Sequence, residues 1–432
     1  MPGTSNVERR SGLVRDLPGF GAVDEVQYAG FIDVDQETDA ALFFWMFESS
    51  ECANGVPIGD LPLVIWLQGG PGSSSLYGLF AEIGPYFVDE TLRLERNPYS
   101  WHKHAHLMFV DYPVGTGFSY TSDPSRYVRN DMQGADDFMT FLRGFYEQHP
   151  RYRSCDLYLT GESYAGKYIP AIAHRVINST CGTVPRLGGI AICGAWTHPE
   201  AQVPHYSPDA ARHGLLSTEQ QRTADRMMHE VMCLMQKGEM LKATQLWDEA
   251  ADFIYGSGGN FSPYDVRDFS GTADDPQDFD RWLALPEVRQ ALHAGDRVWN
   301  EDDGVAVFEA LREDDMVSSL EYLQDVLMNN TRVLLFNGQY DWVTNYSGVK
   351  AMLEKHLQWD GREAYLTAEQ LVWTVDGTVA GYVRKADLLT HVLVLGAGHM
   401  VPADQPEHAF DLIARFVNDK PVVDDGASVL AA

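Results

Sequence analysis

Five short runs of apolar residues lie in the first half of the chain, and each has the length of a buried strand. They cover residues 41–49, 61–68, 106–112, 156–163 and 189–194. Two other segments, 131–150 and 167–179, carry apolar residues three or four positions apart, which predicts helices. Strands that alternate with helices in this order predict a largely parallel sheet with helices on both faces.

The pattern changes between residues 200 and 295, where helical spacing dominates. One long amphipathic segment begins at Ser217 and Thr218, followed by Glu219, and these residue types favour a helix N-terminus. Buried-strand patterns return at 332–345 and 391–406, and an Asp-Gly pair within 373–388 is typical of a hairpin turn. We therefore predict one α/β domain over residues 1–432, with residues 200–295 inserted as a helical cap.

Composition and charge narrow the classes of function. Hydrophobic residues make up 45% of the 432-residue chain, which is enough for a packed core. The formal net charge of −30 makes nucleic acid and anionic membrane surfaces poor partners. Two interpretations of this charge stay open: it maintains solubility, or it suits an acidic compartment in which many carboxylates are partly neutralised.

The cysteines and the chain start bear on the compartment. Five cysteines are too few for a disulfide-built scaffold, and without a Cys-x-x-Cys motif we expect no thiolate metal site. No apolar run has transmembrane length, and the first residues contain no signal-peptide core. Four sequons would accept glycans in a secreted chain: Asn178, Asn260, Asn329 and Asn345.

Ser163 lies in the stretch TGESYAGKYIP, between a predicted strand and a predicted helix. A nucleophile elbow has this context and the pattern Gly-x-Ser-x-Gly, because the tight turn needs small residues on both sides. Gly161 fits the pattern, and Ala165 takes the place of the second glycine. The alternative is an ordinary serine in a glycine-rich loop.

Two later loops supply the partners that a nucleophilic serine needs. Asp341 follows the predicted strand in LLFNGQYDWVTN, and His399 follows the one in VLVLGAGHMVP. The order Ser, Asp, His after three strands is the order found in α/β-hydrolases. Taken singly, a turn-forming Asp and a loop His are unremarkable, but the three together indicate a catalytic triad. An oxyanion hole would use the backbone N–H groups of Tyr164 and of Gly70 in the loop WLQGGPGSSS.

These motifs make the chain resemble the serine carboxypeptidases. The resemblance rests on WLQGGPGSSSLYGLFAEIGPY (66–86), NPYSWHKHAHLMFVDYPVGTGFSY (97–120), TGESYAGKYIPAIA (160–173), NGQYDWVTNY (337–346) and GAGHMVPADQP (396–406). Within the family, Gln68, VGTGFSY, GLLSTEQ and LALPEVRQALHAGD are most similar to the vitellogenic-like members. The resemblance implies an α/β-hydrolase fold and release of single amino acids from peptide C-termini, favoured at acidic pH.

The resemblance also implies residues that bind the substrate's terminal carboxylate. They are Trp66, Gln68 and Glu162, with Glu82 paired to Glu162. Two neighbouring carboxyl groups share a proton because one raises the pKa of the other, so the pair can donate a hydrogen bond to a carboxylate in acid.

Family comparison further places Tyr77 and Met400 near the side chain of the leaving residue, and Tyr164 near the residue before the scissile bond. Such apolar walls imply a preference for hydrophobic residues. The alternative is that an aromatic residue such as Tyr77 belongs to the core.

Three residues depart from the family pattern. Gln68 replaces the Asn of many members, Ser73 replaces a disulfide cysteine, and Thr344 replaces a cysteine after the acid of the triad. We expect altered geometry at the carboxylate, loss of that disulfide and loss of thiol sensitivity. We expect none of the three to touch the triad.

We therefore predict a serine-type carboxypeptidase that needs no metal ion or cofactor. Two alternatives stay open: a serine carboxypeptidase-like acyltransferase, and a non-catalytic stabilising partner of another hydrolase. The implied partners are peptides with a free C-terminal carboxylate and a second copy in a homodimer, and neither nucleic acid nor a membrane. The family implies a lysosome-like or vacuole-like acidic compartment, or secretion.

Overall fold

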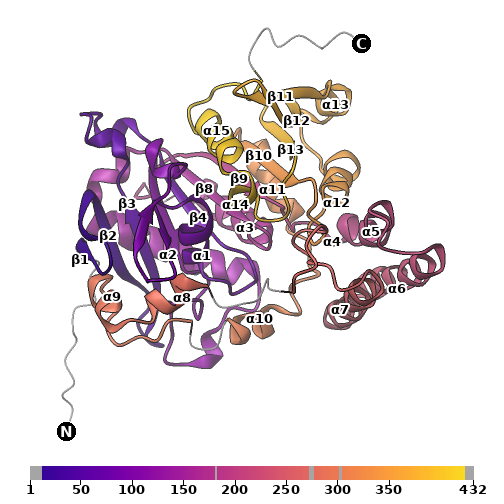
Figure 1. Cartoon of the computed structure of the whole chain (residues 1–432), viewed down its shortest axis with the longest axis horizontal. Helices are drawn as coiled ribbons and strands as arrows, with labels where there is room; N and C mark the ends of the chain where they lie inside the picture. The colour runs from indigo at the N-terminus through magenta and orange to yellow at the C-terminus, as the bar shows by residue number, and fades with distance from the viewer. Residues whose placement is uncertain (1–11, 181, 272–276, 301–303, 424–432) are drawn as a thin grey trace.

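The computed structural model describes residues 12–180, 182–271, 277–300 and 304–423. Its main sheet has the strand order β1-β2-β3-β7-β4-β8-β9-β10-β13-β12-β11 (Figure 1). The six strands from β7 to β13 in this order are parallel, and antiparallel strands extend both edges. This arrangement confirms the predicted α/β-hydrolase fold with its largely parallel central sheet. The strands are β1 (Gly12–Leu17), β2 (Gly21–Asp35), β3 (Ala40–Phe47), β4 (Leu63–Leu67), β7 (His106–Val110), β8 (Leu157–Glu162), β9 (Leu187–Cys193), β10 (Arg332–Gly338), β11 (Leu371–Val375), β12 (Thr378–Ala386) and β13 (Leu389–Val394).

The central strands are apolar along their whole length because helices cover both of their faces. Every residue of β4, β7, β8 and β9 is buried. On β3, Phe44 packs into one core and Trp45 into the other, since successive side chains point to opposite faces. Helices α2 (Asp131–Gln148), α3 (Ala165–Ile177) and α11 (Leu320–Met328) contribute to the first core. Helices α1 (Ser75–Gly78), α8 (Asp278–Leu283) and α15 (Pro406–Val417) contribute to the second.

All named elements between β9 and β10 are helical. They are α-helices, with one short 3₁₀ helix at Val203–His205. In Figure 1, α6 and α7 form a hairpin beside α5, whereas α8 and α9 lie near the opposite end of the sheet, close to β1 and β2. We propose that residues 200–295 are an insertion in a single domain over residues 1–432, because β9 and β10 pair directly with each other across it. The helices are α4 (Pro199–Gln202), α5 (Tyr206–Arg212), α6 (Thr218–Gln236), α7 (Met240–Ser257), α8, α9 (Pro286–Ala291), α10 (Val305–Leu311) and α11.

Local signals explain several element boundaries. Ser217 caps α6 as predicted, but the residue that completes the capping box is Gln220 and not Glu219. The hairpin within 373–388 is formed by β11 and β12, and both Asp376 and Gly377 have the positive φ that a tight hairpin turn requires. The remaining elements are a small hairpin of β5 (Tyr86–Val88) and β6 (Leu94–Arg96), and helices α12 (Tyr346–Ala351), α13 (Arg362–Thr367) and α14 (Val401–Asp404).

The described cysteines form no disulfide with one another, and their thiols are free. Cys52, Cys155, Cys193 and Cys233 are all unpaired, and Cys181 lies outside the described residues. The described helices include none with the length and apolar character needed to cross a bilayer.

Packing around β8 is tight enough for its loss to be measured. Leu159 is fully buried in the first core, so we expect Leu159→Ala to lower the free energy of unfolding by about 2–5 kcal/mol. Leu241, which is 42% exposed on α7, is the matched control, and Leu241→Ala should change stability by less than about 0.5 kcal/mol. Urea unfolding measures both, and equal effects would contradict this account of the core.

Candidate active site

Ser163 occupies the sharp turn between β8 and α3. Its φ of 62° lies in the left-handed region, which costs a residue with a side chain free energy unless its surroundings hold it there. Two hydrogen bonds do so: the Ser163 N–H donates to the Cys193 carbonyl at 2.9 Å, and its own carbonyl accepts from Trp196 N at 3.0 Å. The geometry is that of a nucleophile elbow.

The small residues around Ser163 are required by close backbone approach. A Cβ on Gly161 would lie 2.1 Å from the Leu67 carbonyl oxygen and 2.9 Å from Cβ of Ala165. A Cβ on Gly69 would lie 2.6 Å from Cβ of Ser163. Because these distances are too short for real atoms, neither glycine can be replaced without moving the turn.

Asp341 and His399 form a buried pair at the ends of two neighbouring strands. Asp341 follows β10, His399 follows β13, and His399 Nδ1 lies 2.9 Å from Asp341 Oδ2. A hydrogen bond at Nδ1 leaves Nε2 as the nitrogen that can take a proton from a substrate or nucleophile. Both side chains are almost completely buried.

Ser163 and this pair converge on the end of β9. A Cβ on Gly194 would lie 2.9 Å from Asp341 Oδ2 and 3.1 Å from His399 Nδ1, and the preceding residue, Cys193, accepts the Ser163 N–H. Among the described residues, the Ser163 hydroxyl makes no hydrogen bond to His399. Such bonds often form only when substrate is bound, so the arrangement remains compatible with a triad.

Thr344 contacts the acid and the base of the pair directly. Its backbone N–H donates to Asp341 Oδ1 at 3.0 Å and its hydroxyl to Asp341 Oδ2 at 2.8 Å. The hydroxyl oxygen is also 3.1 Å from His399 Nδ1. The expectation that this substitution leaves the triad untouched is therefore wrong, because the loop after β10 folds back over Asp341. Asp341 and Thr344 are three residues apart in an irregular loop, and no sequence pattern predicts that their side chains meet.

The inserted segment supplies a second contact to His399 that the sequence did not indicate. The ring centroids of Tyr264 and His399 are 5.5 Å apart, and His399 N donates to the Tyr264 carbonyl at 2.6 Å. Trp342 and Val343, directly after Asp341, donate their N–H groups to the Pro263 carbonyl. Residues 263–264 thus hold both loops of the pair in place.

The backbone donors predicted for the oxyanion lie beside Ser163. A Cβ on Gly69 would be 2.7 Å from Tyr164 N, so the loop that contains Gly70 touches the start of α3. Gly70 has a φ of 107°, a conformation that favours glycine. Among the described residues, neither the Gly70 nor the Tyr164 N–H donates to a protein group, which leaves both donors free for a ligand.

Asp111 holds this loop and was not singled out from the sequence, although it lies within the quoted motif FVDYPVGTGFSY. Its Oδ1 accepts from Ser74 Oγ at 2.5 Å and Ser75 N at 3.1 Å, and its Oδ2 accepts from Phe118 N at 2.9 Å. Burial raises the pKa of Asp111 to about 7, against the lowering effect of these hydrogen bonds. The carboxyl group therefore ties the loop after β4 to the loop after β7.

The four residues predicted to bind a carboxylate form one buried chain of hydrogen bonds. Trp66 Nε1 donates to Gln68 Oε1 at 2.7 Å. Gln68 Nε2 donates to Glu162 Oε1 at 2.5 Å and faces Glu82 Oε1 at 3.4 Å. The remaining oxygens, Glu82 Oε2 and Glu162 Oε2, are buried and accept no hydrogen bond from the described donor groups. A proton shared between the two carboxyl groups would satisfy them.

The electrostatics of this pair agree with a shared proton. Burial raises the pKa of Glu82 to about 7. Burial, the charge of Glu82 and a hydrogen bond to Glu82 raise the pKa of Glu162 well above its usual range. Both carboxyl groups therefore favour the protonated form, and Glu162 is the residue directly before Ser163.

Tyr77 and Met400 are half-buried; Tyr77 belongs to α1, and Met400 directly follows His399. The Tyr77 ring packs edge-to-face on Phe279, with centroids 5.9 Å apart. Burial and the charges of Glu82 and Glu162 raise the pKa of the Tyr77 phenol. Within the described residues, no three His, Cys, Asp or Glu side chains are grouped to hold a metal ion.

Comparisons with known proteins bear on the family and the fold of the chain. The family model described as "Serine carboxypeptidase" matches residues 18–419. The probable serine carboxypeptidase CPVL of Homo sapiens is 36% identical, over 95% of this chain and 87% of its own length. The venom serine carboxypeptidase of Apis mellifera is 36% identical (91% and 84%), and the vitellogenic carboxypeptidase of Aedes aegypti is 32% identical (90% and 83%). The solved structure of KEX1(Δ)P, a prohormone-processing carboxypeptidase from Saccharomyces cerevisiae, superposes with a TM-score of 0.81 at 26% identity, over 94% of this chain and 93% of that one.

The Thr344 contacts predict a defect in rate. Thr344→Val keeps the shape of the side chain but removes the hydroxyl donor to a charged carboxylate, which is worth about 1.5–3 kcal/mol. We expect kcat for peptide hydrolysis to fall about 10- to 100-fold with little change in KM. Thr344→Ser retains the hydroxyl and should stay near the wild-type rate. Equal kcat values for the two variants would exclude a role for the hydroxyl.

Proposed function

The chain belongs to the serine carboxypeptidase family, and on this premise we propose that it releases single amino acids from peptide C-termini through an acyl-enzyme at Ser163. Serine-type carboxypeptidase activity follows from the family. The observation that supports the proposed residues best is the hydrogen-bonded chain from Trp66 to Glu82, which lies directly beside the Ser163 turn.

The chemistry follows the geometry of three side chains. Ser163 Oγ attacks the last peptide carbonyl while His399 Nε2 accepts its proton, and Asp341 stabilises the imidazolium that forms. The N–H groups of Gly70 and Tyr164 hold the oxyanion. His399 then protonates the departing amino group, and the same three residues activate the water that cleaves the ester.

The carboxyl pair accounts for removal of one residue at a time. Glu162 directly precedes Ser163, so a terminal carboxylate bound to the protonated Glu162 would place the last peptide bond near the Ser163 hydroxyl. An internal peptide bond has no carboxylate at this distance. The site therefore favours chain ends.

The same pair supports activity in acid. Because the pKa of Glu82 is raised to about 7 and that of Glu162 is raised as well, the pair is protonated and uncharged in acid and begins to ionise as the pH rises through about 7. An ionised pair repels a carboxylate. The stability that the proton contributes to the folded state is also present in acid and is lost as pH rises through this range.

We propose a hydrophobic leaving residue, an acidic or extracellular location and a homodimer as further properties. The half-buried Tyr77, and the half-buried Met400 next to His399 in the chain, support the first. The proton-dependent pair and the venom relative support the second. The homodimer is supported by the family resemblance alone, and light scattering of the purified protein would test it.

Three of the four sequons are accessible to glycans. Asn178, Asn260 and Asn329 are exposed, whereas Asn345 is 3% exposed and caps α12 with its side chain.

Replacing Ser163 tests the proposed nucleophile. We expect Ser163→Ala to lower kcat/KM for an N-blocked hydrophobic dipeptide by about 10³-fold or more, because no other group can form the acyl-enzyme. Release of the C-terminal amino acid between about pH 4 and 8 is the measurement. Ser125→Ala, at an exposed serine in the 3₁₀ turn Pro124–Arg126, is the matched control. Retained activity in Ser163→Ala would refute the assignment, and a wild-type protein inactive at every pH but active with an ester and an alcohol would favour acyl transfer.

Replacing Glu82 tests the carboxyl pair. In the wild type, KM for a free-carboxylate peptide should rise by up to about tenfold per pH unit above about pH 7, with kcat little changed. Glu82→Gln replaces the carboxyl group whose pKa is raised to about 7 with an amide that cannot ionise, so its KM should vary much less over the same range. The exposed Glu147→Gln and the same peptide with a C-terminal amide serve as controls. A parallel rise of KM in Glu82→Gln and the wild type would exclude the pair as its cause.

A further inference from the structure

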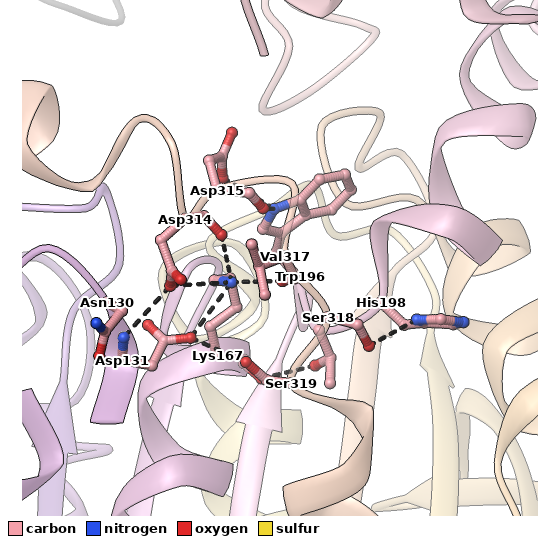
Figure 2. Close-up of polar contacts among 12 residues, drawn as sticks. Asn130, Asp131, Lys167, Trp196, His198, Asp314, Asp315, Val317, Ser318 and Ser319 are labelled. Atoms are coloured by element: carbon pink, nitrogen blue, oxygen red, sulfur yellow. Dashed lines mark hydrogen bonds and ion pairs between the residues drawn. The ribbon is translucent and has the colours of Figure 1, made fainter. Parts of the chain in front are cut away.

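Lys167 is a fully buried cation in the first turn of α3, four residues after Ser163. Its Nζ donates to the carbonyl oxygens of Asp314 at 2.7 Å and Val317 at 2.6 Å (Figure 2). Carboxylate oxygens of Asp131 and Asp314 approach Nζ at 3.3 and 3.4 Å. Burying a lysine costs desolvation free energy, and removing one partner from a buried ion pair is strongly destabilising because it leaves an unpaired charge.

The contacts join three elements that are distant in sequence. Asp131 begins α2, Lys167 belongs to α3, and Asp314 and Val317 lie in the segment 312–319 between α10 and α11. The Asp131 N–H donates to Asp314 Oδ2 at 3.3 Å, and Ser319 Oγ donates to Asp131 Oδ2 at 2.8 Å. Segment 312–319 is therefore fastened at both of its ends to the helices behind Ser163.

The N-terminal end of α10 packs against the loop that contains Gly70. A Cβ on Gly72 would lie 2.7 Å from the Gly304 carbonyl oxygen and 3.1 Å from Cβ of Val307, the third residue of α10. Val307 also packs against Gly115 in the loop after β7. Segment 312–319 follows α10 directly, so whatever holds this segment also holds α10 on the oxyanion loop.

The cluster contains more acid than Lys167 can balance. Asp315 adds a third carboxyl group, which accepts from Trp196 Nε1 at 3.0 Å (Figure 2). Burial raises the pKa of Asp314 and of Asp315 to about 6 each, while the Lys167 charge opposes this effect. Both pKa values lie above those of aspartates in an unfolded chain. The protonated aspartates therefore contribute their whole stabilisation of the folded state below about pH 4, and this is lost as the pH rises through about 6.

Other titratable groups face the cluster or segment 312–319 from neighbouring elements. On α11, burial and the charges of Glu321, Asp131 and Asp314 raise the pKa of the Tyr322 phenol. His198 lies 2.8 Å from Ser318 Oγ, and burial lowers its pKa to about 4. The phenols of Tyr164 and Tyr168 face it from α3, and burial and the charge of Asp131 raise the pKa of both. From α7, Asp248 adds to the negative charge at Asp315, but Asp248 is itself paired with Arg312. None of these groups adds a positive charge that would balance all three aspartates.

We propose that Lys167 is a positioning residue that clamps segment 312–319, and through it α10, onto the helix that follows Ser163, and that the clamp loosens when its surplus aspartates ionise. The proposal deepens the proposed function, on which it rests, by adding a regulation of the same site. The protein would lose its oxyanion loop geometry toward neutral pH by a route separate from the Glu82–Glu162 pair.

The test uses a reagent that needs no peptide. The rate constant for labelling of Ser163 by diisopropyl fluorophosphate reports the nucleophile and the oxyanion loop together. Hydrogen exchange of the amides of residues 304–319, corrected for the intrinsic effect of pH, reports the clamp itself. Both are measured at about pH 5 and 7.5 for the wild type, Lys167→Met, Asp315→Asn and a control, Lys242→Met, whose side chain is 69% exposed.

At pH 5 we expect Lys167→Met to label at least about tenfold more slowly than the wild type and to exchange faster in 312–319, while Lys242→Met matches the wild type. Asp315→Asn removes one surplus charge without touching Nζ, so its labelling rate relative to the wild type should rise between pH 5 and 7.5. A Lys167→Met protein that melts at lower temperature but labels at the wild-type rate would reduce Lys167 to a structural residue and overturn the proposal.

If Lys167→Met does not fold, Asp315→Asn decides alone. A labelling ratio to the wild type that does not change with pH, together with unchanged exchange of 312–319, would overturn the clamp. Failure of the wild type to release C-terminal amino acids would instead count against the proposed function, because labelling and exchange do not depend on that activity.

Discussion

A carboxyl group that leaves water must gain a partner or a proton, since an isolated buried charge costs more free energy than a domain can spare. Around Ser163 the chain meets this constraint in several ways, of which three differ most. One carboxylate is paired with a histidine and accepts from a hydroxyl, one pair keeps a proton, and one cluster surrounds a lysine. The groups are Asp341 with His399 and Thr344, Glu82 with Glu162, and Asp131, Asp314 and Asp315 with Lys167. Each arrangement ties the shape of the site to the acidity of its surroundings.

The parallel sheet brings these groups together. Gln68 follows β4, Glu162 ends β8, Asp341 follows β10 and His399 follows β13, so all four emerge at the carboxyl ends of neighbouring strands. Ligand sites form at this edge because the loops that leave it are free to vary while the strands stay fixed. Glycines at the ends of β8 and β9 then allow the loops to approach within van der Waals distance.

The central strands could be predicted from the apolar runs, because buried parallel strands have a simple pattern. Strands β1 and β2 were not predicted, because exposed residues interrupt their apolar pattern. The turn at Ser163 could be predicted because small residues leave a local signature. Strand ends were less predictable: the patterns cover 332–345 and 391–406 and run into glycine-rich loops, whereas β10 and β13 end at Gly338 and Val394. The contacts of Thr344, Tyr264 and Lys167 could not be predicted. Each depends on how distant loops fold onto one another, which no periodicity records.

The pairing of β9 with β10 also affects how the chain folds as it is made. About 140 residues, among them the helical insertion at 200–295, separate Cys193 from Arg332, yet the two strands lie side by side in register. At a synthesis rate of about 5–20 residues per second, β9 has no neighbour on one side for roughly 7–30 s. During this interval an apolar strand has an open edge, which is prone to association with other chains. The helical insertion therefore sets a period in which the nascent protein depends on protection by its own earlier strands or by chaperones.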